Sequence, residues 1–114
     1  MEAEELRLPG QQSQAHMIGQ CHVLLGDLDE AIAWIRQAVD QSIIPHISLS
    51  AYANVLTQLG RVDEALASID RIKEIIPGYT IRGSINAYRR SFGSEDARQK
   101  MTAGLNMLLD LGYE

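Results

Sequence analysis

Three histidines and one cysteine are the side chains of this sequence best suited to bind a metal ion or act as nucleophile and base. His16 and His22 are six residues apart, so on one helix they would point to different sides and would share a metal ion poorly. Cys21 and His22 are adjacent and also point apart. We therefore expect no metal or cofactor, and we expect Cys21 to be a small buried residue of an apolar helical stretch.

Paired carboxylates occur at Asp29–Glu30, Asp63–Glu64 and Glu95–Asp96. Such pairs can act as general acid and base, but here they follow turn residues and sit where a helix would start. Negative charge at that place stabilises the positive end of the helix dipole. The Gly-Ser steps at 83–84 and 93–94 are isolated and form no phosphate-binding loop. The sequence therefore predicts a protein that is not an enzyme.

The distribution of charge limits the kinds of molecule that we expect the protein to bind. The net charge is −5, with the acidic excess in the first 60 residues. Neither half has a basic excess, so we expect no direct binding of nucleic acid or of anionic lipid. Arg82, Arg89 and Arg90 form a small basic cluster, which we expect to be a solvated helix end, with contact to an acidic partner as the alternative.

Compartment and domain number follow from the same composition. No apolar run reaches the ~20 residues needed to cross a bilayer, and the acidic start MEAEELRLPG has no apolar signal core. The single cysteine fits a reducing compartment, so we expect a cytoplasmic protein. With 114 residues we expect an N-terminal arm, residues 1–11, and one domain, residues 12–114.

Two nearly identical phrases, GDLDEA at 26–31 and GRVDEA at 60–65, determine the predicted architecture. They are offset by 34 residues, a period typical of a two-helix repeat. The chain then divides into a repeat over residues 12–45 and a second over residues 46–79. In each, apolar residues recur at helical spacing before and after the glycine of the phrase. We interpret the phrase as a helix end, a turn and a new helix start.

Small residues occupy matching places in the two predicted units. Gly19 and Ala53 match on the first helices, and Ala31 and Ala65 match on the second helices. Antiparallel helices joined by a tight turn approach closely only where side chains are small, and a larger residue would overpack the contact. We therefore expect Ala31 and Ala65 to lie against a neighbouring helix.

The tail, residues 80–114, is not a third copy of the repeat. Thr80 and Ser94 are predicted N-caps of two further helices, and Gly112 is predicted to end the second one. Repeat arrays need an atypical terminal unit over their last apolar face. We therefore expect this pair of helices to cap the array.

The period, the Gly-x-x-Asp-Glu-Ala phrase, the small residues and the prolines at 45 and 77 resemble the tetratricopeptide repeat over residues 12–79. The resemblance implies an all-α, right-handed α/α superhelix, with two helix-turn-helix repeats and a C-terminal capping pair. It also implies a non-catalytic module that binds a protein or peptide in a groove lined by the first helix of each repeat. Matching positions place nine residues in that groove: Ser13, His16, Gln20, Leu24, Ile47, Ser50, Asn54, Thr57 and Gln58.

The groove does not match the family members that clamp a terminal carboxylate. Asn54 matches their asparagine, but Ser50 stands where they have a lysine. The resemblance therefore favours an extended segment or a helix as ligand. The alternative is self-association: the first helix would expose apolar residues that a preceding repeat covers in a longer array, and exposed apolar surface usually marks an interface.

The tail carries a narrower resemblance. Pro77–Ile81, Arg89–Phe92, Gly104-Leu105 and Leu111-Gly112 are similar to the C-terminus of multidomain bacterial proteins. In those proteins a class III adenylate or guanylate cyclase domain, or a winged-helix DNA-binding domain, precedes tetratricopeptide repeats. The resemblance implies a regulatory or scaffolding region of such a signalling protein, without cyclase chemistry of its own.

Overall fold

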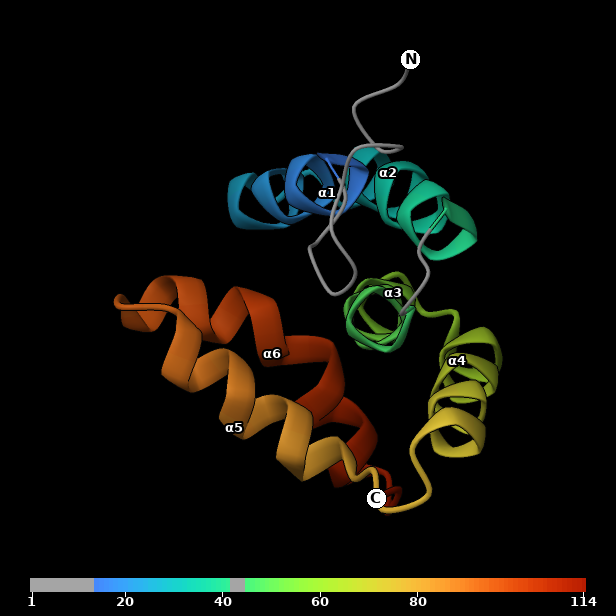
Figure 1. Ribbon diagram of the computed structural model, residues 1–114. Coiled ribbons are helices and arrows are strands. Elements are labelled where there is room, and N and C mark those ends of the chain that lie inside the picture. Colours follow the sequence, from blue (N-terminus) through green and yellow to red (C-terminus); the bar gives the residue numbers. More distant parts are fainter. Residues whose placement is uncertain (1–13, 42–44) are drawn as a thin grey trace.

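Six α-helices make up the described part of the chain, residues 14–41 and 45–114, in the computed structural model (Figure 1). In chain order they are α1 (Gln14–Leu25), α2 (Leu28–Gln41), α3 (His46–Gln58), α4 (Val62–Ile75), α5 (Ile81–Ser91) and α6 (Glu95–Asp110). These residues contain no β-strand. The predicted all-α fold is confirmed.

The repeated phrase forms the turn of each of the first two hairpins. Gly26 and Gly60 have φ of 80° and 81°, the left-handed conformation that glycine adopts most easily at a helix end. After Gly60, the N–H of Arg61 returns to the carbonyl of Leu56 at 2.8 Å, which satisfies a carbonyl of the last turn of α3. The Asp-Glu pairs fall in the first turns of α2 and α4, as predicted.

The small residues at the crossings are buried against neighbouring helices, as predicted. Ala31, Ala53 and Ala65 have no exposed surface. A Cβ on Gly19 would lie 2.5 Å from Cγ1 of Ile35, so α1 and α2 could not pack this closely with any larger residue there. The spacing of these residues therefore fixes how each hairpin closes.

The C-terminal hairpin starts and ends at its predicted caps. Thr80 Oγ1 accepts a hydrogen bond from the N–H of Gly83 at 3.0 Å, and Ser94 Oγ accepts one from the N–H of Ala97 at 3.1 Å. Gly112 follows α6 with a φ of 98°. Because these caps use only neighbouring residues, they could be recognised in the sequence.

Helix α3 is the centre of the molecule, and Figure 1 shows it surrounded by α1, α2, α4 and α6. The core contains fully buried side chains from all six helices, among them Val23, Ile35, Leu49, Leu56, Ile72, Ile81, Met101, Leu105 and Leu108. The α5–α6 hairpin differs from the prediction in its position. Its helix α6 packs along α3 and reaches α1, and α5 lies on the outer side of α6, so the pair does not stack on α4 as a third unit.

Candidate protein-interaction surfaces

The predicted groove residues are mostly inside the protein. Ser13 lies outside the described residues. Four others are buried: His16, Ser50, Asn54 and Thr57. The remaining four are half-buried: Gln20, Leu24, Ile47 and Gln58. The structure thus reduces the predicted groove, because His16, Asn54 and Thr57 have almost no exposed surface that a partner could contact.

Helix α6 packs on α3 over Asn54, and the side chain of Asn54 holds the helix there. Asn54 Nδ2 donates to the carbonyl of Lys100 at 3.2 Å, and Asn54 Oδ1 accepts from the N–H of Gly104 at 2.7 Å. Those two backbone groups are i and i+4, the pair that bond each other in a regular helix. Both the nitrogen and the oxygen of the Asn54 carboxamide therefore bond the backbone of α6, and the side chain has no exposed surface for a partner.

The backbones of α3 and α6 lie close enough for the Asn54 side chain to bond the backbone of α6. A Cβ on Gly104 would lie 1.9 Å from the carbonyl oxygen of Asn54, so only glycine fits. At the other end of the contact, Lys100 Nζ donates to the carbonyl of Leu24 at 2.8 Å, near the C-terminus of α1. A cation there also suits the negative end of the helix dipole. The chain's own last helix therefore occupies the face that sequence reasoning assigned to a partner.

His16 is a buried structural residue. Its Nδ1 lies 2.9 Å from Ser48 Oγ, which links α1 to α3. Burial lowers the pKa of His16 to about 4, so the imidazole is neutral at physiological pH. A serine beside a histidine could form a nucleophile and base, but both side chains are buried and neither lines the cleft described next.

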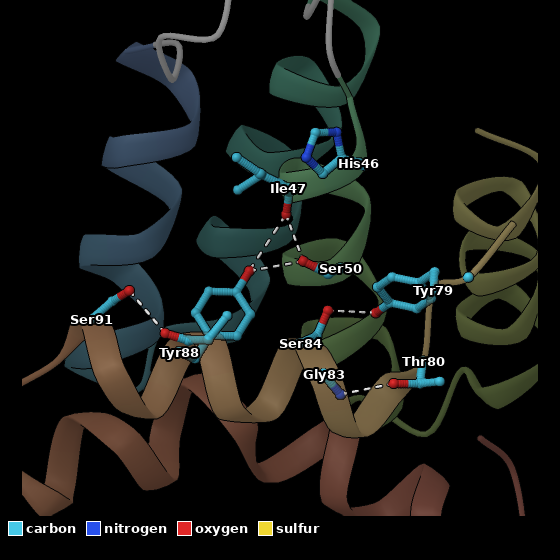
Figure 2. A pocket seen from close by; sticks show the side chains of 11 residues that line it. His46, Ile47, Ser50, Tyr79, Thr80, Gly83, Ser84, Tyr88 and Ser91 are labelled. Carbon is cyan, nitrogen blue, oxygen red and sulfur yellow. Dashed lines mark hydrogen bonds between the residues drawn. The ribbon is translucent and has the colours of Figure 1, made fainter. Parts of the chain in front are cut away.

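A cleft of about 440 Å³ remains open between the first turns of α3 and the length of α5 (Figure 2). Eleven residues line it: His46, Ile47, Ser50, Gly78, Tyr79, Thr80, Gly83, Ser84, Ala87, Tyr88 and Ser91. Ile47 and Ser50 belong to the predicted groove. His46 is the first residue of α3. The remaining eight lie in or just before α5, where their recurrence every three to four residues is the sequence signal of a shared face.

Hydroxyl groups from both walls meet in this cleft. Ser50 Oγ donates to the carbonyl of Ile47 at 2.8 Å and lies 3.0 Å from Tyr88 Oη (Figure 2). Ser84 Oγ donates to Tyr79 Oη at 2.6 Å. Burial raises the pKa of Tyr88 to about 12 and also raises the pKa of Tyr79. Both phenols are therefore protonated and uncharged at neutral pH, and the cleft offers hydrogen-bonding groups with no Asp, Glu, Lys or Arg among its lining residues.

The outer face of α1 is a second accessible surface, and it is apolar. Met17 and Leu25 are 58% and 79% exposed, and Ile18 lies beside them on the same helix. Cys21 is exposed between Met17 and Leu25, so the expectation that it is buried is wrong. The reason is that α1 packs through its opposite face, which includes Gly19. Positions 17, 21 and 25 form one stripe along the helix.

Side chains that could hold a metal ion do not gather in this structure. Within residues 14–41 and 45–114, no group of three or more His, Cys, Asp or Glu side chains is placed for a metal. In the same ranges, none of the helices has the length and apolar character to cross a membrane.

The sequence model of one protein family, described as anaphase-promoting complex, cyclosome, subunit 3, matches residues 3–72. The match covers more than half of the 114 residues. The chain belongs to this family of tetratricopeptide-like repeats. No curated protein and no solved structure matches the chain significantly.

Membership in this repeat family gives the chain its general role, that of a helical-repeat protein-interaction module. The matched range ends within α4. Helices α5 and α6 therefore lie beyond the matched range, although they contribute one wall of the cleft and the helix that covers the groove. The family assignment explains the first two hairpins, and the tail has to be explained from its own contacts.

Proposed function

We propose that the chain is a non-catalytic scaffold that pairs with a second copy of itself through the outer face of α1. The observation that carries the proposal is the exposed stripe of Met17, Cys21 and Leu25, with Ile18 at its edge. Contiguous exposed apolar side chains are uncommon unless a partner covers them. The first helix is also the place where self-association was expected from the sequence.

A second copy suits this face because α1 can meet itself without charge repulsion. The helix, QAHMIGQCHVLL, contains no Asp, Glu, Lys or Arg. Two copies packed antiparallel would also place opposite ends of their helix dipoles together. Cys21 is midway between Met17 and Leu25, so a two-fold axis at the centre of the stripe would bring the two Cys21 residues together.

Sedimentation velocity over a range of concentrations tests the pairing. The double variant Met17→Ser with Leu25→Ser should shift the protein to monomer, whereas Met107→Ser should not, although Met107 on α6 is also 46% exposed. Mild oxidation with copper phenanthroline should join two chains through Cys21 only in the paired protein. A wild-type chain that stays monomeric at high concentration overturns the proposal.

A partner protein at the part of the groove that α6 leaves open is the second candidate. Gln20, Leu24, Ile47 and Gln58 are half-buried there, and tetratricopeptide-like repeats generally mediate protein contacts. Pull-down with the wild type and with Gln20→Ala tests it. Asn54→Ala is unsuitable, because that side chain holds α6. Partner capture that is indifferent to Gln20→Ala counts against this groove.

The regulatory context of the module is part of the same proposal. We propose that it serves as the C-terminal regulatory or scaffolding region of a bacterial, cytoplasmic signalling protein of the adenylate cyclase-like or winged-helix type. The support is the resemblance carried by residues 77–112, which include α5 and α6. Reading the genomic frame upstream of Met1 tests it. A cyclase or winged-helix domain there supports the context, and a stop codon directly upstream overturns it.

A further inference from the structure

We infer that the cleft between α3 and α5 binds an uncharged peptide segment, recognised through amide groups of its backbone or of an Asn or Gln side chain. This inference is independent of the pairing through α1, because no residue of α1 lines the cleft. It concerns a surface that exists only because the α5–α6 hairpin packs where it does (Figure 1).

The shape of the cleft suits a linear ligand. Its volume of about 440 Å³ lies within the ~300–1,000 Å³ typical of binding sites. Along α5 the lining residues run from Thr80 to Ser91, a length of roughly 17 Å at ~1.5 Å per residue. Gly83 and Ala87 are small and lie in this row, so the backbone of a ligand can come close to α5.

The hydrogen-bonding groups of the cleft include both free donors and free acceptors. Because Ser84 donates to Tyr79 Oη, the proton of Tyr79 has no acceptor among the described residues. Thr80 Oγ1 accepts from Gly83, so its own proton is also available. Ser91 Oγ donates to the carbonyl of Ala87, which leaves the lone pairs of this hydroxyl for a ligand. Amide groups, which pair an N–H with a C=O, match such a mixture.

His46 adds an unsatisfied polar atom at the α3 end of the cleft. Its Nδ1 is buried and has no hydrogen-bond partner within the described residues. A buried polar atom without a partner costs about 1–3 kcal/mol. His46 therefore adds a polar side chain with incomplete hydrogen bonding to the lining of the cleft.

The charge of the lining residues argues against acidic and basic peptides as ligands of the cleft. No Asp, Glu, Lys or Arg lines the cleft. A charged group that entered would lose hydration and meet no opposite charge, which is costly. The two tyrosines stay neutral because their pKa values are raised by burial. An acidic or basic peptide is therefore a poor ligand for this surface, in spite of the overall charge of −5.

NMR titration of the ¹⁵N-labelled full chain tests the inference with three capped tripeptides that differ only in the central residue. The probes are acetyl-Ala-Gln-Ala-N-methylamide and its counterparts with Glu or Lys in place of Gln. The Gln peptide should shift the amide signals of Ser84 and Ala87. The Glu and Lys peptides should bind at least about tenfold more weakly.

Two variants show whether binding occurs in the cleft. Ala87 is exposed and lines it, so Ala87→Trp should fill the cleft and abolish binding, whereas Asn86→Trp, on the neighbouring exposed position outside it, should not. Tyr79→Phe removes one donor and should weaken binding about threefold to tenfold. Absence of binding by the Gln peptide, equal binding of the charged peptides, or insensitivity to Ala87→Trp overturns the inference.

Discussion

Acid should destabilise this protein through one buried histidine. His16 has no exposed surface, and its Nδ1 bonds Ser48 Oγ between α1 and α3. Desolvation lowers the pKa of His16 from 6.5 to about 4 in the folded chain. The folded chain therefore keeps this imidazole neutral down to about pH 4, whereas in the unfolded chain it takes up a proton below its ordinary pKa of 6.5.

The magnitude follows from the two pKa values. Between pH 6.5 and about 4 the unfolded chain binds more protons than the folded chain, so stability falls as pH falls. Each pH unit costs ~1.36 kcal/mol, which gives a loss of about 3 kcal/mol across the window. The contribution of the neutral His16 side chain to the free energy of unfolding is fully present above pH 6.5 and completely lost below pH 4. Such a loss is a large fraction of the ~5–15 kcal/mol that usually stabilises a domain.

Urea unfolding at a series of pH values across this window measures the effect. The matched variant is His16→Asn, which places a neutral polar group near the position of Nδ1 and takes up no proton in this range. We expect the variant to be less stable at neutral pH and its disadvantage to shrink by about 3 kcal/mol toward pH 4. Surface carboxylates affect both proteins alike and cancel. Parallel pH profiles for the two proteins would show that His16 does not cause the loss of stability.

Three further predictions concern the backbone and the contact of α6. Gly104→Ala should cost about 3 kcal/mol or prevent folding, because its Cβ would overlap the backbone of Asn54, and circular dichroism melting measures this. Asn54→Leu should cost at least about 2 kcal/mol in urea unfolding by removing the two hydrogen bonds that join α3 to α6, and a loss below ~0.5 kcal/mol contradicts the assigned bonds. Gly60→Ala should cost about 1–2 kcal/mol because of its positive φ, whereas Gly93→Ala, in open space without a positive φ, should be nearly neutral in the same melts.

Local features of the fold were predictable because neighbouring residues produce them. The turns at Gly26 and Gly60 depend on a left-handed residue followed by acids in the first helical turn. The caps at Thr80 and Ser94 bond an N–H three residues later. Each of these interactions spans only a few residues, so the sequence pattern contains all of its participants.

The candidate surfaces were predictable only in part. Ile47 and Ser50 were expected in the groove and do line the open cleft. Tyr79, Ser84 and Tyr88 were not expected, because their role depends on which side of α5 faces α3. The extent of the groove was overestimated, since the tail was expected to cover the end of the array and instead lies along α3.

The repeated motif predicted two helical hairpins related by 34 residues, and the tail predicted a dissimilar third hairpin. Long-range packing places α6 on α3, joins Asn54 to Lys100 and Gly104, and leaves a cleft open between α3 and α5. The physical reason is distance along the chain. A helix cap or turn is completed within a few residues, but the contacts of Asn54 join positions 46 and 50 residues apart. Such contacts form only when apolar burial brings whole helices together, and glycine at position 104 then permits the close approach that selects this packing.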